Sequence, residues 1–150
     1  EHVQPLLDAI GAKTWRFGAR AEQANAVKLA ANFCIASAIG TMGEAAALVR
    51  GHDVAPADFL AMLTSTLFAA PAYQGYGGMI AAERYAPAGF KLPLGLKDVR
   101  LALAAGDAVH VPMPLASVLR DGLIEAIAHG DGELDWAALA NVAKRRAGQG

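Results

Sequence analysis

Lys28 is the residue whose surroundings most favour chemistry. Between Gln23 and Val49 the only charged residues are Lys28 and Glu44, so one ammonium group lies in an otherwise apolar or small-residue stretch. The positions three and four residues away hold only alanine and asparagine, so no carboxylate on the same helix can pair with this lysine. An ammonium group without a local partner is available to polarise or protonate an oxygen of a bound molecule.

Two asparagines accompany this lysine at helical spacing. Asn25 and Asn32 lie three residues before and four residues after Lys28, so a helix places the three side chains along one stripe. This stripe suits a small oxygen-rich ligand. In the alternative interpretation, the lysine reaches water from the rim of the helix and the two amides are merely solvated. The spacing alone leaves both interpretations open.

Lys97 and Asp98 form a second candidate pair, where a proline and glycine loop meets a new helix. Opposite charges at a helix start are also common without any function. Other patterns are set aside. The glycines of residues 75–80 lack the third glycine and the preceding strand of a dinucleotide loop. No histidine falls at metal-ligand spacing and no serine lies in a nucleophile elbow, so we expect neither a metal site nor a serine nucleophile.

The spacing of apolar residues predicts one long helix over about residues 20–49. Ala36, Gly40 and Gly43 are small residues within it, and we expect them to permit close packing of another helix, another domain or another subunit. A short helical turn is expected around residues 6–10, and further helices over residues 56–70, 73–85 (broken), 96–105, 115–129 and 135–146. β-branched residues never alternate cleanly with polar ones, so the predicted fold class is all-α.

Length and composition favour one soluble domain. A chain of 150 residues with 55% hydrophobic content can bury one core, and 13 basic against 14 acidic residues leave no excess charge for nucleic acid or a membrane. The longest uncharged stretch, residues 59–82, is interrupted by proline and glycines, so no membrane helix is expected there. Cys34 is the only cysteine, and its apolar neighbours predict a buried thiol in a reducing, cytoplasmic compartment. The missing initiator methionine suggests a piece of a longer protein.

Three separated segments carry a family resemblance. Residues 18–33, from Gly18 through Lys28 to Asn32 and its phenylalanine, resemble the glycine-led Lys-x-x-x-Asn segment of the β-hydroxyacid dehydrogenases, relatives of 3-hydroxyisobutyrate dehydrogenase and tartronate semialdehyde reductase. Residues 90–102, which contain Lys97 and Asp98, resemble the second signature of that family, and residues 130–138 resemble its C-terminal segment. The resemblance covers essentially the whole chain.

This resemblance implies a single helical domain of the 6-phosphogluconate dehydrogenase C-terminal-domain-like type, built around one long helix. Residues 1–17 would be the end of a nucleotide-binding domain and its connector, and residues 18–150 the helical substrate-binding and dimerisation domain. The chain contains no Gly-x-Gly-x-x-Gly motif, so an N-terminal Rossmann domain outside it would bind NAD or NADP. The implied partners are a small hydroxyacid or semialdehyde, that Rossmann domain, and further copies in a homodimer or tetramer.

The resemblance also implies roles for individual residues. Lys28 would be the general acid and base in the interconversion of a short β-hydroxyacid and its semialdehyde or keto form, and Lys28→Ala would remove turnover with little effect on folding. Asn32 would bind substrate and Lys97 would reach the cofactor. Asp98 would orient Lys97 or cap its helix, and Phe90 and Asn25 would support the site.

One departure and two alternatives accompany this hypothesis. Ala21, Glu22 and Gln23 stand where the family often has further glycines, which puts the substrate contacts of that turn in doubt. A non-catalytic helical dimerisation or interaction module would explain the long helix, but not the two lysines. Imine reductases are similar in architecture to this family but usually replace the catalytic lysine, so Lys28 favours a hydroxyacid or semialdehyde substrate.

Overall fold

The computed structural model describes residues 2–150, and Glu1 lies outside the described part. Seven helices follow one another as α1 (Gln4–Ile10), α2 (Ala21–Arg50), α3 (Pro56–Ser65), α4 (Pro71–Ala81), α5 (Leu92–Asp107), α6 (Pro114–Ala128) and α7 (Ala140–Arg146). Two short 3-10 segments, η1 (Asp131–Glu133) and η2 (Trp136–Leu139), join α6 to α7. Within residues 2–150 the only β-type pairing is an isolated bridge between Lys91 and Asp135. The predicted all-α class is therefore confirmed.

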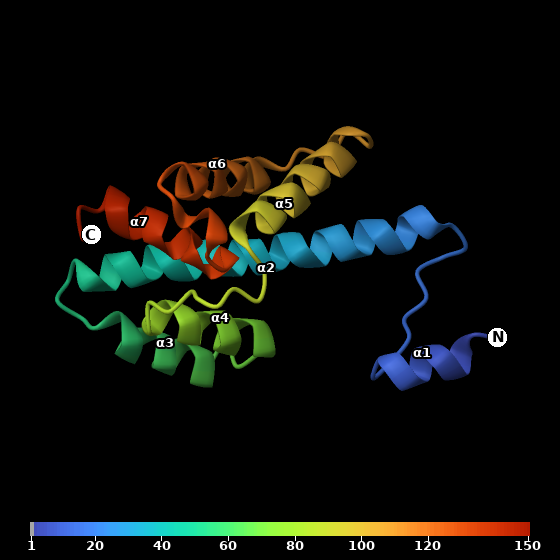
Figure 1. Ribbon diagram of the computed structural model, residues 1–150, viewed down its shortest axis with the longest axis horizontal. Coiled ribbons are helices and arrows are strands. Elements are labelled where there is room, and N and C mark those ends of the chain that lie inside the picture. Colours follow the sequence, from blue (N-terminus) through green and yellow to red (C-terminus); the bar gives the residue numbers. More distant parts are fainter. Residues whose placement is uncertain (1) are drawn as a thin grey trace.

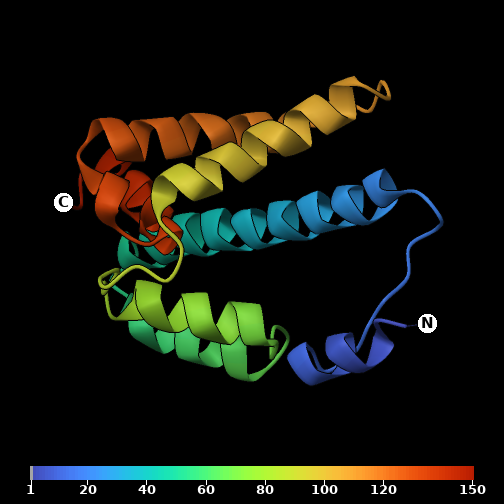
Figure 2. The same cartoon turned by 45° about the vertical axis from the view of Figure 1, so that its right-hand side comes forward.

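Helix α2 is the axis around which the other helices pack. Figures 1 and 2 show it between α5 and α6 on one side and α3 and α4 on the other, with α7 beside its C-terminal half. Ile39 and Met42, in the middle of α2, are at most 1% exposed and belong to one hydrophobic core that also includes residues from α3 to α7. Burial of this central stretch, more than helix propensity, stabilises a helix of this length.

By length and mean hydropathy alone, α2 could cross a membrane. The same composition is expected of a helix that occupies the centre of a helical domain, because such a helix is apolar on more than one face. Five helices of the same chain contact α2, and they bury about a third of its most apolar stretch, 33%.

The small residues of α2 are used within this chain. A Cβ atom on Gly43 would lie 2.7 Å from Cα of Ala140 in α7, and one on Gly40 would lie 2.8 Å from a methyl carbon of Leu119 in α6. Helices α6 and α7 reach these distances only because the glycines have no side chain. The expected close packing of other helices against α2 is therefore confirmed at these two positions.

Two predicted helix ends were wrong. Helix α3 ends at Ser65 and not near residue 70, because the hydroxyl groups of Thr64 and Thr66 donate to main-chain carbonyls one turn earlier and compete with helix continuation. Pro71 begins α4 and does not end α3, which agrees with the preference of proline for the first turn. The predicted break in the following helix is also absent, since α4 is continuous.

Helix α5 begins earlier than predicted. It starts at Leu92 instead of near residue 96, with Pro93 in its first turn, where the missing N–H of proline costs nothing. This earlier start places Lys97 and Asp98 inside the helix, in its second turn. The positions of both side chains are therefore set by helix packing and not by a loop.

Cys34 is exposed, so the prediction of a buried thiol was wrong. Its neighbours Phe33 and Ile35 are half-buried. Because each residue turns the helix by about 100°, adjacent apolar positions do not share a face, and Cys34 points outward between two inward residues.

The N-terminal residues present apolar side chains to solvent. Helix α1 contains no buried residue, and Figure 1 shows it apart from the bundle, at the end of an extended connector. Six large apolar side chains are exposed here, namely Val3, Leu6, Leu7, Ile10, Trp15 and Phe17. Apolar surface of this extent is typical of a contact with another part of a protein.

Candidate active site

Lys28 and Asp98 form the centre of the site. Lys28, two turns into α2, donates a hydrogen bond from Nζ to Oδ2 of Asp98 on α5 at 2.6 Å. The side chain of Asp98 is 2% exposed, whereas that of Lys28 is 52% exposed. The lysine thus neutralises a buried carboxylate while half of its side chain remains accessible from solvent.

Asn32 shares the same acceptor. Its Nδ2 donates to Oδ2 of Asp98 at 2.6 Å, so one carboxylate oxygen accepts from an ammonium and an amide one turn apart on α2. The shared acceptor holds the Lys28 and Asn32 side chains toward α5. Asn25, the third member of the predicted stripe, is exposed and shares no hydrogen bond with the other two within residues 2–150.

Lys97 adds a second cation. Its Nζ lies 3.5 Å from Oδ1 of Asp98, an oxygen that accepts no hydrogen bond from any described residue. The Lys97 side chain is 60% exposed, which leaves its ammonium largely free. Two ammonium groups around one carboxylate give the group a net positive charge, which suits an anionic ligand. The structure therefore brings Lys28, Asn32 and Lys97 to one surface.

Asp98 does not cap α5, so that expectation was wrong. The helix begins at Leu92, six residues before Asp98. Its short contacts are with Lys28 and Asn32, and its contact with Lys97 is longer. Sequence reasoning had no signal for the Lys28 contact, because 70 positions separate the two residues.

The protonation of Asp98 follows from these contacts. Burial by itself raises the pKa of the Asp98 carboxyl group, but the hydrogen bonds from Lys28 and Asn32, together with the charges of Lys28 and Lys97, outweigh burial and lower the pKa below its ordinary value. Asp98 is therefore a carboxylate at neutral pH.

Phe90 lies in the segment that leads into α5. Its ring is half-buried and packs edge-on against Trp136, with ring centroids 4.8 Å apart. Its main-chain N–H donates to Oδ2 of Asp135 at 2.9 Å. Sequence reasoning named Phe90 as a supporting residue but gave no role to Asp135 or Trp136, although both lie in the C-terminal segment that carries the family resemblance.

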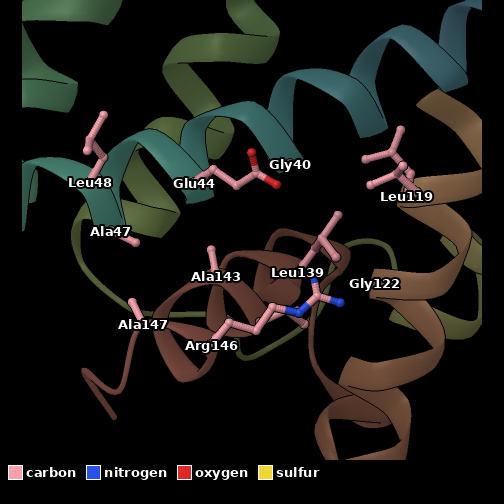
Figure 3. Close-up of a pocket in the computed structure, with 12 residues that line it drawn as sticks. Gly40, Glu44, Ala47, Leu48, Leu119, Gly122, Leu139, Ala143, Arg146 and Ala147 are labelled. Atoms are coloured by element: carbon pink, nitrogen blue, oxygen red, sulfur yellow. The ribbon is translucent and has the colours of Figure 1, made fainter. Parts of the chain in front are cut away.

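The site is an open surface and not a closed cavity of this chain. A pocket of about 400 Å³ lies elsewhere, between α2, α6 and α7, where Figure 3 shows Gly40, Leu119 and Ala143 around it. None of the four residues of the Lys28 group lines that pocket. Among residues 2–150, no three His, Cys, Asp or Glu side chains are arranged to hold a metal ion.

Known proteins resemble this chain in sequence. The family model described as NAD-binding of NADP-dependent 3-hydroxyisobutyrate dehydrogenase matches residues 23–143. An uncharacterised oxidoreductase of Bacillus subtilis, YfjR, is 38% identical over 95% of this chain and 49% of its own length. Glyoxylate/succinic semialdehyde reductase 1 of Arabidopsis thaliana is 29% identical over 96% of this chain and 49% of its own. The 3-sulfolactaldehyde reductase of Escherichia coli is 28% identical over 99% of this chain and 49% of its own.

Solved structures share the fold. The 3-hydroxyisobutyrate dehydrogenase (ygbJ) of Salmonella typhimurium superimposes with a TM-score of 0.86 at 20% identity, over 93% of this chain and 49% of that one. The Mycobacterium tuberculosis 3-hydroxyisobutyrate dehydrogenase has a TM-score of 0.79 at 23% identity, over 93% and 50% of the two chains.

The match over residues 23–143 defines a domain of the NAD(P)-dependent hydroxyacid dehydrogenase class. Since the family model covers most of the chain, this chain belongs to the 3-hydroxyisobutyrate dehydrogenase family. It spans about half the length of the relatives that it matches.

Proposed function

We propose that this chain contributes the proton-transfer group, Lys28, to an NAD(P)-dependent dehydrogenase that interconverts a short β-hydroxyacid and its semialdehyde or keto form. The observation that carries the proposal is the position of Lys28, which a buried carboxylate shared with Asn32 holds in place while half of the lysine side chain stays exposed. Membership of the 3-hydroxyisobutyrate dehydrogenase family supports it.

The chemistry assigned to Lys28 is general acid and base catalysis. In reduction, the Lys28 ammonium donates a proton to the carbonyl oxygen, and in oxidation its amine accepts the proton of the hydroxyl group. When bound, the nicotinamide cofactor supplies or removes the hydride. Asp98 positions the ammonium through the 2.6 Å hydrogen bond. Asn32 retains its carbonyl oxygen and one N–H, which can bind a substrate oxygen beside the lysine.

The cofactor fits this chain only in part. The exposed ammonium of Lys97, which is only loosely held by Asp98, can bind a phosphate or another anionic part of a dinucleotide. Residues 2–150 offer neither a parallel sheet nor a glycine-rich phosphate loop, so the main contacts with NAD or NADP are assigned to an N-terminal Rossmann domain. Residues 1–17 would join that domain to this one, and their exposed apolar side chains would pack against it.

The proposal also covers the oligomeric state of the protein and its cellular compartment. The family resemblance supports a homodimer or tetramer in the cytoplasm that acts on small hydroxyacids or semialdehydes. Gly43 is buried against Ala140 of the same chain, whereas Gly40 is half-buried and lines the pocket between α2, α6 and α7.

A non-catalytic dimerisation module is the main alternative. It would account for α2, but it supplies no reason for a buried carboxylate that holds one lysine and attracts a second at the same surface. An imine-reductase-like activity is the other alternative, and the presence of Lys28 argues against it.

The test is an activity panel with the complete protein, including its N-terminal half. Each nicotinamide cofactor is assayed with short 3-hydroxyacids and their semialdehydes, for the unmodified protein, Lys28→Ala and a control, Lys144→Ala. The control removes a lysine of α7 that pairs with Glu83 and with no residue of the Lys28 group. Loss of a general acid and base is expected to lower turnover by about 10²–10⁴-fold in Lys28→Ala alone. Near-normal turnover of Lys28→Ala would remove this residue from the mechanism.

A further inference from the structure

Asp135 is a buried carboxylate that joins two distant segments of the chain. The residue is 3% exposed. Its Oδ2 accepts hydrogen bonds from the main-chain N–H groups of Gly89 at 3.0 Å and Phe90 at 2.9 Å, and its Oδ1 accepts from Ala137 at 3.1 Å. A buried carboxylate with three such donors is a strong and directional link, because any donor that moves away leaves charge unsatisfied in the interior.

Main-chain hydrogen bonds continue this link in both directions. The N–H of Trp136 donates to the carbonyl of Phe90 at 2.8 Å, and the N–H of Leu92 donates to the carbonyl of Leu134 at 3.0 Å. The segment that enters α5 is therefore held on both sides of Lys91 by residues 134–136. Its position depends on a part of the chain more than 40 residues further on.

The side chain of Trp136 extends the link to α5 itself. Its ring is 3% exposed and packs against Phe90, and a Cβ atom on Gly95 would lie only 2.8 Å from Cε3 of the indole. The first turn of α5 thus rests directly on the indole ring. The indole N–H has no hydrogen-bond partner among the described residues, so ring shape and not hydrogen bonding makes this contact.

Gly95 and Asp98 are three residues apart and lie on neighbouring positions of one helical face. A change in the contact between Trp136 and Gly95 would therefore move the carboxylate that holds Lys28. Neither Asp135 nor Trp136 shares a hydrogen bond with Lys28, Asn32 or Asp98, so their influence on the site passes through α5.

On the basis of the proposed function, we infer that Asp135 and Trp136 are positioning residues for the reaction of Lys28. They fix the entry and first turn of α5, and so the place of Asp98. A displacement of about 1 Å at a reacting group can lower a rate by about 100-fold, which is why a remote contact of this kind can control turnover.

The experiment compares four substitutions in the complete protein. Asp135→Asn replaces one acceptor with a donor that faces N–H groups, and Trp136→Ala removes the ring from Gly95. Trp136→Phe keeps an aromatic ring but removes the unpartnered N–H together with part of the fused ring system that lies against Gly95. Val142→Ala is the matched control, since Val142 is equally buried, at 3%, but lies on α7 and lines a pocket to which no α5 residue contributes.

Turnover, KM, cofactor affinity and thermal stability are measured for each variant at a temperature at which all are folded. We expect Asp135→Asn and Trp136→Ala to lower kcat by about 10–100-fold with little change in KM or cofactor affinity, as misplacement of a reacting group predicts. Trp136→Phe should lower kcat less than Trp136→Ala, because part of the ring remains against Gly95. Val142→Ala should lower the melting temperature and leave kcat unchanged.

Gly95→Ala covers the case in which Trp136→Ala does not fold. Its added methyl group pushes α5 away from the indole without altering Asp135, and it should also lower kcat. The inference is overturned if Lys28→Ala abolishes turnover while the Asp135, Trp136 and Gly95 variants keep the kcat of Val142→Ala, and the proposed function then stands. If Lys28→Ala itself retains turnover, the proposed function fails and this inference falls with it.

Discussion

Lys28 and Asp98 stand 70 positions apart in the sequence, and a 2.6 Å hydrogen bond joins Nζ of one to Oδ2 of the other. The pair is asymmetric, because the carboxylate is buried and the lysine is half exposed. Removal of the carboxylate would leave a lysine that water can solvate. Removal of the lysine would leave a buried charge with one amide as its remaining short contact. The two residues therefore contribute differently to the stability of the fold.

This asymmetry changes the expectation for Lys28→Ala. The sequence alone predicted little effect on folding, whereas the buried Asp98 makes a loss of about 1–3 kcal/mol in the free energy of unfolding the expected result. The double variant Lys28→Ala/Asp98→Asn should recover much of that stability, since no buried charge remains, yet recover no turnover. Urea unfolding and steady-state rates measure the two quantities. Additive losses of stability in the double variant would contradict a direct pair.

The lowered pKa of Asp98 predicts a dependence of stability on acid pH. The folded state binds the Asp98 proton less readily than the unfolded state, so this residue stabilises the fold above its unfolded pKa, and the stabilisation is lost as pH falls through the lower folded pKa. Below about pH 4, the free energy of unfolding should fall more steeply for the unmodified protein than for Asp98→Asn. Equal slopes for the two proteins would show that Asp98 has an ordinary pKa in the fold.

Tyr85 predicts the opposite dependence at alkaline pH. Burial, aided by the negative charges of Glu83 and Asp131, raises the pKa of the Tyr85 phenol to about 12. The unfolded state loses this proton near pH 10 and the folded state does not, so stability should decrease between about pH 10 and 12, by roughly 2–3 kcal/mol. Lysines also lose their charge in this range, so Tyr85→Phe is the necessary reference. The prediction fails if Tyr85→Phe loses stability over this range as steeply as the unmodified protein.

A glycine substitution in α2 tests the close approach of α7, and a second one in α4 serves as its control. In Gly43→Ala the added methyl group would lie 2.7 Å from Cα of Ala140, a main-chain atom that cannot turn aside, so a loss of roughly 1–3 kcal/mol is expected. Gly75, in the interior of α4, has no atom within 4 Å of its ideal Cβ position. Gly75→Ala should therefore stabilise the protein by up to about 1 kcal/mol through helix propensity. Thermal unfolding of both variants measures the difference, and a stable Gly43→Ala would show that α7 shifts easily.

Much of the helical architecture could be predicted from local patterns. Helix α2 was expected over about residues 20–49 and spans Ala21–Arg50, because its apolar periodicity and lack of proline are properties of neighbouring residues. The errors at the end of α3 and at the starts of α4 and α5 have local causes too. Threonine hydroxyls bond back to α3, Pro71 begins α4 where it was expected to end α3, and Pro93 lies in the first turn of α5.

The sequence by itself determined the all-α class, the long central helix, and the choice of Lys28, Asn32 and Lys97 as candidate site residues. Residue type, helical period and family motif are all properties of short segments of the chain. Only the tertiary structure decided which carboxylate holds Lys28, and that Cys34 is exposed. It also showed that Asp135 and Trp136 support the start of α5. These are contacts between segments more than 40 residues apart, or rotations of a helix against its neighbours. They depend on how helices pack in space, which helical spacing within one segment does not specify.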